Sequence, residues 1–438
     1  MNKPKPEILI LIIVIILLAV FLLWEIDGIP FHPDETSILY QTRDFELYIS
    51  NPLSLSWDPE NADDPEQIYR SLNPPLPKYI LGFSRWLAGF STEDVANDWD
   101  WTLSWQENEA RGAVPDPILL RATRVTSTLF VILSLLFIYL VGAWIGGRAT
   151  GILAVILLGT HALLVLHGRR AMAEGIMTFG ITFALYGMLQ GQKRPWLAGL
   201  TAAIAASTKL SVFAIVPISF LGTIWLTKED SNRPKRITFN VVVFILVFIA
   251  TFLVLNPILW GNPISGARII WSARTEFLEG QITVINAIEP GQIMDTPLER
   301  IVILMGHLFI ADPQIAEAGN YLQQTKLAAD SYLGNPIYTL SRGMILGGLS
   351  IYLCLMGVVF GTLNSKQASG EERRGLMLVL LATLAMSLAI LIANPIPYQR
   401  YYVPLIPFIC LWISYGIIHL FNRIKLAAVT RTKKNGPD

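Results

Sequence analysis

Residues 8–35 read "ILILIIVIILLAVFLLWEIDGIPFHPDE" and place a long apolar run shortly before two adjacent carboxylates, Asp34 and Glu35. The run itself, 8–24, carries no charged residue, and a helix needs roughly 20 apolar residues to cross a bilayer. No small-residue cleavage site follows the run, which indicates an anchor helix and not a cleaved signal peptide. The stretch therefore predicts a membrane helix that ends in an acidic, water-facing loop.

The composition extends this prediction to the whole chain. Hydrophobic residues make up 53% and charged residues 15% of the sequence, whereas a soluble domain has about 25% charged residues. The sequence predicts an all-α polytopic membrane protein with about 10–11 transmembrane helices. The net charge is zero, so no basic field suggests nucleic acid as a partner. The candidate spans are 8–24, 75–90, 122–145, 149–166, 171–189, 196–227, 237–259, 336–363, 376–394 and 402–421.

The distribution of basic residues orients these spans. They gather before the first run (Lys3, Lys5), in the loop 228–236 (Lys228 among them), around 366–374 and in the tail 423–438. Cytoplasmic loops carry such an excess of Lys and Arg. We therefore expect both termini in the cytoplasm and the segments 25–74, 260–335 and 395–401 outside it.

The number of crossings decides how two ambiguous segments are treated. With Asp34 outside and Lys228 inside, the chain must cross an odd number of times between them. This requirement favours 196–227 as one long or broken crossing, centred near "AASTKLS", and places the Trp-rich acidic segment 91–117 inside. In the alternative arrangement 75–90 is re-entrant and 91–117 lies outside. The first arrangement is preferred, and both stay open at this point.

The acidic pair lies in a loop, 25–74, that is too long to be a simple turn between helices. One interpretation is an acid pair in the first turn of a helix over 34–49, where the helix dipole favours negative charge. The other is a general base with a supporting carboxylate at the water-facing end of the bundle. The residues alone support both equally.

Two other segments on the same expected face carry positive charge. "SLNPPLPKYILGF" (71–83) begins the second candidate span and places Lys78 one turn inside it, where snorkelling to the interface is an ordinary explanation. "NPIPYQRYYVPLIPF" (394–408) begins the last span and flanks Arg400 with tyrosines. An aromatic belt explains the tyrosines, and an Arg fork that holds a phosphate is the functional alternative.

Several charged residues fall inside or beside the remaining spans. Lys209 would be costly in the bilayer centre, so we expect it to face the bundle interior or a wet cavity. His167, Arg169, Arg170 and Glu174 cluster at a boundary that the preferred arrangement makes cytoplasmic, where they would serve as an anchor. No histidine or cysteine spacing indicates a metal site.

In their order along the chain, these features resemble the GT-C class of membrane glycosyltransferases, specifically the protein O-mannosyltransferase and aminoarabinose-transferase group. The resemblance is carried by Asp34-Glu35, "NPPLPK" (73–78), "STKLS" (207–211) and "RYYVPLIP" (400–407). Asn73 stands where that group has His, and Pro77 where it has Gly. The loop 260–335 has no large soluble domain, but its "PLERIVILMGHLFIA" (297–311) is typical of an amphipathic helix that could form a lid.

The resemblance implies a reaction and a site. A sugar would pass from a polyprenyl-phosphate donor to an acceptor hydroxyl of a protein, lipid or glycan, in one inverting displacement on the extracytoplasmic side of the plasma membrane. Asp34 would act as the base and Glu35 would position a substrate or a metal. Lys78 and Arg400 would bind the donor phosphate. Further substrate contacts are expected from His32, Asn73, Tyr398 and Tyr401. A divalent metal stays open, and membrane lipids are the expected surroundings.

A secondary transporter or lipid flippase is the alternative function. It too would bury cationic residues such as Lys209 and Arg400 along a path, but it typically shows inverted repeats with paired broken helices. The sequence indicates only one such break. The transferase hypothesis requires Asp34, Glu35, Lys78 and Arg400 to face one shared cavity, which is a geometric expectation.

Overall fold

The computed structural model describes residues 6–225, 232–288, 291–317, 319–368 and 370–434, without the side chains of 426–434. All regular elements in these ranges are helices, so the all-α prediction is confirmed. Lys3, Lys5 and Lys228, which helped to orient the spans, lie outside the described residues.

Six helices in the described ranges are long and apolar enough to cross a membrane. Apolar side chains such as Leu17, Leu246 and Leu346 lie exposed on three of them, and large exposed apolar surfaces are typical of contact with lipid. These helices are α1 (Pro6–Leu23), α7 (Pro117–Gly159), α12 (Arg233–Leu255), α16 (Gly343–Gln367), α17 (Gly370–Ala393) and the continuous run of η7 (Gln399–Leu405) with α18 (Ile406–Lys434).

The long helix α7 is a hairpin of two membrane segments. Its 43 residues would extend about 65 Å as one straight helix, twice the thickness of the hydrocarbon core. Gly147 has φ 84°, and the chain folds back there. A Cβ on Gly142 would lie 2.8 Å from the Cα of Gly151, so the two arms contact each other through glycines. The predicted spans 122–145 and 149–166 are both present, the second one continuing into α8 (Ala162–His167).

The segment 196–227 also forms a hairpin, which corrects the prediction of one crossing. It consists of α10 (Pro195–Ala206), a break at Ser207–Lys209, η4 (Leu210–Ile215) and α11 (Val216–Ile224). The amide of Leu76 donates to the carbonyl of Ser207 over 3.1 Å, which places the break next to α5. At the other end, a Cβ on Gly191 would lie 3.0 Å from Gly222. The chain thus runs to the break and returns.

The predicted span 75–90 is instead the short helix α5 (Leu76–Leu87). Its 12 residues extend only about 18 Å, and it packs on α7 and on α3 (Asp44–Ser50). The segment after it returns to the first loop: Thr36 donates to the carbonyl of Ala113 over 2.9 Å, and Tyr69 to Asp98 over 2.6 Å. Segment 91–117 therefore lies on the same face as 25–74. The preferred arrangement, which puts these two segments on opposite faces, is wrong, and the structure agrees with the alternative in placing them on one face.

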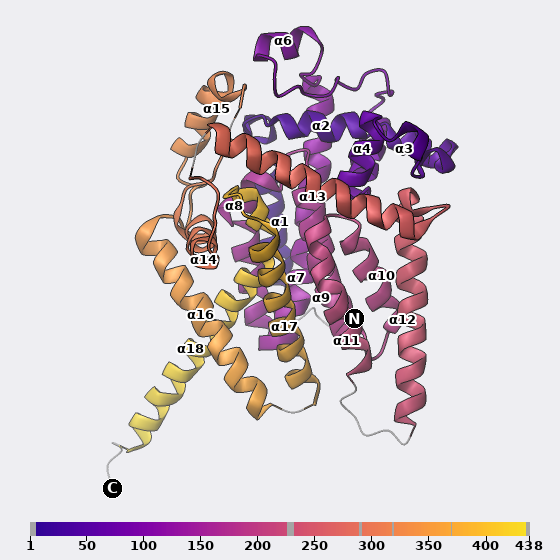
Figure 1. The fold of residues 1–438 in the computed structure, drawn as a ribbon. Coiled ribbons are helices and arrows are strands. Elements are labelled where there is room, and N and C mark those ends of the chain that lie inside the picture. The colour runs from indigo at the N-terminus through magenta and orange to yellow at the C-terminus, as the bar shows by residue number, and fades with distance from the viewer. Residues whose placement is uncertain (1–5, 226–231, 289–290, 318, 369, 435–438) are drawn as a thin grey trace.

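We call the face that carries these loops the site face; it is the top of the molecule in Figure 1. The long helix α13 extends across it, and α6 projects above α2 (Figure 1). An ion pair of 2.8 Å between Lys193 and Glu371 joins two turns at the opposite face. The helices of the site face are α2 (Pro33–Gln41), α3, α4 (Pro65–Leu72), α5, α6 (Trp105–Ala110), α13 (Pro263–Ile288) and α15 (Leu322–Gly334).

Between these faces lies one large apolar core. It is built mainly from α1, α7, α17, α18 and α9 (Ala173–Gln190), with Trp412 among its largest buried side chains. The predicted amphipathic segment 297–311 is helical as α14 (Pro297–Met305) followed by the π-turn Gly306–Ile310. The remaining short elements are Ile26–Gly28, Pro52–Leu55, Pro59–Asn61 and Pro257–Leu259.

This arrangement makes a prediction for cysteine labelling in a background without Cys354 and Cys410. Ser54→Cys and Glu93→Cys should react with a membrane-impermeant thiol reagent from one side of the membrane, and Lys193→Cys from the other. All three residues are exposed, so access to the reagent depends on sidedness alone. Labelling of Ser54→Cys together with Lys193→Cys from one side, and of Glu93→Cys from the other, would restore the rejected arrangement.

Candidate functional site

Four side chains from three distant segments form a closed ring on the site face. Arg400 in η7 donates from Nη1 to the Oδ2 of Asp34 at the start of α2. Its Nε lies 3.3 Å from Glu317 Oε1, in the segment that precedes α15. Glu317 Oε2 in turn lies 2.6 Å from His32 Nε2, and His32 Nδ1 accepts from the amide of Asp34 over 3.1 Å. The ring joins the first loop to the last membrane helix.

Asp34 is the most accessible member of this ring. Its side chain is 27% exposed, against 13% for Arg400, 6% for Glu317 and none for His32. Burial raises the pKa of Asp34, but the Arg400 guanidinium counters it by its charge and its hydrogen bond, and the pKa lies below its usual value. The carboxylate is thus ionised at neutral pH and partly open to a ligand, as a general base requires.

A second cation lies beside this group of four contacting side chains. Lys209, at the break between α10 and η4, lies 5.8 Å from the ring centre of Tyr401, and the Arg400 guanidinium lies 5.5 Å from the same centre. The Lys209 amino group pairs with Glu174 over 3.0 Å and its side chain stays 25% exposed. The prediction that Lys209 faces the interior or a cavity is confirmed. Tyr401 and Tyr398, whose rings are 5.6 Å apart, also lie here as predicted.

Glu35 has a different environment from its neighbour. Its carboxylate accepts from Arg124 Nε over 2.8 Å and Nη2 over 2.7 Å, and from the amides of Ala171 over 2.8 Å and His32 over 3.1 Å. The side chain is fully buried. Four hydrogen bonds occupy both oxygens, so Glu35 fixes the first loop to α7 and to the start of α9, and it does not face a ligand.

The cluster at 167–174 lies on the site face together with 25–74, and not on the opposite face where the preferred arrangement placed it. Arg170 is fully buried and donates to the carbonyls of Pro30 over 3.2 Å and Ile315 over 2.6 Å. His167 and Arg169 are also buried. The prediction failed because the crossings were counted wrongly: the second arm of α7, followed by α8, returns the chain to the site face.

Lys78 is not brought to Arg400. Its amino group pairs with Asp44 over 2.7 Å, and Arg70 binds the same carboxylate over 2.7 Å. The side chain is only 2% exposed and lines a small cavity with Arg70 and Asn256. The expectation that Asp34, Glu35, Lys78 and Arg400 face one shared cavity is therefore wrong, and of the four side chains only Asp34 and Arg400 contact each other. Asn73 also lies apart and donates to Gln41 over 3.1 Å.

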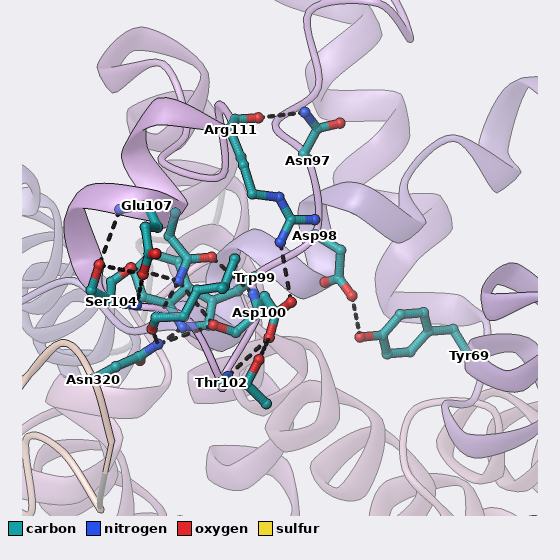
Figure 2. A network of polar contacts seen from close by, with 12 residues as sticks. Tyr69, Asn97, Asp98, Trp99, Asp100, Thr102, Ser104, Glu107, Arg111 and Asn320 are labelled. Carbon is teal, nitrogen blue, oxygen red and sulfur yellow. Dashed lines mark hydrogen bonds and ion pairs between the residues drawn. The ribbon is translucent and has the colours of Figure 1, made fainter.

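The segment that carries Glu317 is held by a polar network on its far side (Figure 2). The Trp99 indole donates to Asn320 over 3.0 Å, and Asn320 donates to the carbonyl of Asp100 over 3.0 Å. The loop around Asp100 is itself ordered by the capping box of Ser104 and Glu107. On the near side, the amide of Gln399 donates to the Gln314 side chain over 2.9 Å.

Sequence reasoning missed Glu317, Arg124 and Asp44. Glu317 lies in "PQIAEAGN", which has no motif and no helical periodicity, so no local signal could have identified it. Arg124 was hidden inside a predicted span, although a charge at such a position is a signal of a partner. Within the described ranges, no three His, Cys, Asp or Glu residues are grouped so that they could hold a metal ion.

Comparison with known proteins agrees with this geometry. Residues 49–262, just under half of the chain, match the family model of dolichyl-phosphate-mannose-protein mannosyltransferases. No match was found among curated protein sequences. The matched segment contains Lys78 and Lys209 but neither Asp34 nor Arg400, so the family model does not bear on the Asp34–Arg400 pair.

Solved structures of polytopic glycosyltransferases share the fold. The apo oligosaccharyltransferase of Archaeoglobus fulgidus aligns with a TM-score of 0.52 and 12% identity, over 100% of this chain and 53% of that one. The same archaeal protein, AglB, in complex with an inhibitory peptide and a dolichol-phosphate gives 0.50 and 12%, over 99% and 52%. Apo ArnT from Cupriavidus metallidurans gives 0.50 and 13%, over 93% and 59%.

This chain thus spans between about half and three fifths of the solved structures that it resembles. Their low sequence identity shows a shared fold. With the family match, they confirm the resemblance to GT-C membrane glycosyltransferases, and to the protein O-mannosyltransferase and aminoarabinose-transferase group in particular.

The contacts of Glu35 predict a large effect on stability. Glu35→Gln leaves Arg124 buried without its counter-charge, and breaking a buried pair in this way costs about 3–5 kcal/mol. We expect a marked fall in the thermal unfolding temperature of the purified protein. Asp27→Asn removes an acid from the exposed pair with Arg121 and should change it little. Equal unfolding temperatures for the two variants would contradict the role of Glu35 in fixing the first loop to α7 and α9.

Proposed function

We propose that this chain, with its GT-C fold and its resemblance to the protein O-mannosyltransferase and aminoarabinose-transferase group, is a glycosyltransferase that uses a polyprenyl-phosphate-linked sugar. The observation that carries the proposal is the part-exposed pair of Asp34 and Arg400 on the site face. It supplies a carboxylate that can accept a proton next to a guanidinium that can bind a phosphate. The positive-inside rule places this face outside the cytoplasm.

The donor phosphate is assigned to Arg400 and Lys209. Both cations lie near the Tyr401 ring, at 5.5 and 5.8 Å, and Lys209 is accessible where Lys78 is not. A positive pair that neutralises the departing phosphate stabilises charge where it develops in the transition state. The archaeal relative bound to a dolichol-phosphate supports a lipid phosphate as the ligand of this fold.

The reaction is a single displacement at the anomeric carbon. The acceptor oxygen forms a bond to that carbon while the bond from carbon to the phosphate oxygen breaks, and the configuration inverts. The acceptor proton passes to Asp34, and the lipid phosphate leaves with its charge held by Arg400 and Lys209. The phosphate can bind the remaining N–H donors of Arg400 while Nη1 stays on Asp34, and its negative charge makes Asp34 a stronger base.

The remaining predicted site residues take supporting roles in this proposal. Glu35 holds the loop, and its buried, saturated carboxylate assigns it no contact with substrate. Tyr398 and Tyr401 line the ligand space beside Arg400. The acceptor is an alcohol of a protein, lipid or glycan, and α13 with α15 covers the face by which it arrives.

The first test is sugar transfer in proteoliposomes that contain polyprenyl-phosphate sugars. Asp34→Asn should lower the release of free polyprenyl phosphate by about 100-fold or more, since a general base contributes about 10²–10⁴ to the rate. Asp63→Asn, an exposed acid of the same loop, is the matched control and should keep full activity. Undiminished turnover in Asp34→Asn would remove this residue from the base role. Movement of labelled lipid or solute without transfer would favour the transporter.

A second test separates the two candidate lysines by the binding of polyprenyl phosphate. Lys209→Met should weaken binding by about tenfold or more, because a hydrogen bond to a charged group contributes about 1.5–3 kcal/mol. Lys78→Met should leave the affinity unchanged, since its amino group is already paired with Asp44. Adding Glu174→Gln to Lys209→Met avoids an unpaired buried acid and should keep the weakened binding. The reverse ranking would return the phosphate to Lys78.

A further inference from the structure

We propose that Glu317 is a positioning residue, which fixes Asp34 through both His32 and Arg400, so that the base is in place only while residues 311–317 and 319–321 are docked. This inference rests on the proposed function for the role of Asp34, and on the ring geometry for everything else. Glu317 reaches the site from a segment remote in sequence from the other members of the ring.

The first contact of Glu317 is with His32 and fixes the backbone at Asp34. His32 Nδ1 accepts from the amide of Asp34 over 3.1 Å, so the proton of a neutral imidazole is on Nε2. Nε2 then donates to Glu317 over 2.6 Å. Both ring nitrogens are occupied, and the imidazole is fully buried. Glu317 therefore sets the orientation of His32, and His32 caps the helix turn that carries Asp34.

The second contact of Glu317 is with Arg400 and fixes the Asp34 side chain. A guanidinium presents several N–H donors in one rigid plane. Arg400 donates from Nη1 to Asp34, and its Nε lies 3.3 Å from Glu317 Oε1 in an ion pair that lacks hydrogen-bond geometry. Two carboxylates thus attract the guanidinium from different sides. Without Glu317, Arg400 keeps Asp34 and the Tyr401 ring but loses the negative charge beside Nε, so it can turn about the Asp34 contact and the direction of the Asp34 oxygens is less fixed.

Glu317 itself does not contact a ligand. Its side chain is 6% exposed, and the ring of Tyr321 lies over His32 at 5.4 Å between centroids. The side chains that hold its segment come from other parts of the chain: Arg170 binds the carbonyl of Ile315, Gln399 binds Gln314, and the 99–104 loop binds Asn320 (Figure 2). Docking of the segment and placement of the base are therefore one event.

The test combines kinetics with hydrogen exchange on the full-length protein. In Glu317→Gln a single amide oxygen can accept from His32 or from Arg400 but restores neither charge. We expect kcat to fall by about 30–100-fold, since a misplacement of about 1 Å can cost 10²-fold. The KM for the donor should change by less than about threefold, because Arg400 and Lys209 remain. Glu60→Gln, exposed on the same face, is the control.

Hydrogen exchange supplies a readout that needs no activity. Amides of residues 34–38 should exchange about tenfold faster in Glu317→Gln than in the wild type, while those of α9 stay unchanged. If Glu317→Gln does not fold, Asn320→Ala releases the segment without touching the ring and should give the same pattern, with a smaller effect.

The possible failures are distinguishable. A wild type that transfers no sugar, with the exchange pattern as expected, overturns the proposed function but leaves the coupling of Glu317 to Asp34 in place. Unchanged exchange at 34–38 overturns the coupling whatever the activity. A rise in donor KM with kcat preserved would also contradict positioning and make Glu317 a binding residue.

Discussion

The structure depends on one buried ion pair. Glu35 and Arg124 form a two-point fork, with bonds of 2.8 and 2.7 Å, in which neither side chain is more than 3% exposed. The same carboxylate accepts a hydrogen bond from the backbone amide of Ala171. Because an uncompensated charge in such a place is costly, the first loop, the first arm of α7 and the start of α9 can only assemble together. The junction thereby fixes the backbone of His32 and the helix turn that carries Asp34.

The adjacent acids Asp34 and Glu35 have different environments and therefore different roles. Glu35 points into the bundle, where four hydrogen bonds hold it. Asp34, one residue earlier and in the same first turn, points along the site face to a single Arg400 contact and is partly exposed. One carboxylate is thereby structural and its neighbour free to react. The interpretation as an acid pair in the first turn of a helix is confirmed, since both residues lie in the first turn of α2, and the role of Asp34 as a general base stays a prediction.

Two helical hairpins explain how distant residues converge. The turn at Gly147 returns the chain to the site face and delivers Arg170, and the break at Ser207–Lys209 brings Lys209 to Tyr401. The two topology errors had one origin. Counting 75–90 as a crossing forced 196–227 to be one crossing, because parity ties the two together. Segments 91–117 and 167–174 were therefore placed on the face opposite to 25–74, whereas the structure places all three on one face.

The sequence by itself determined the all-helical membrane fold and most of its spans, and it singled out Asp34, Arg400 and Lys209, which the structure places near one another on the site face. These are signalled locally, because a membrane span must be apolar and a charge beside it is conspicuous. The sequence could not determine which charged side chains pair with each other or which helices pack together. Whether α5 spans depends on how far 12 residues reach, and whether Lys78 is free depends on Asp44 and Arg70. Glu317 has no local signal at all. Only the tertiary structure decided these points, because the partner of a buried charge is set by packing between segments far apart in the chain.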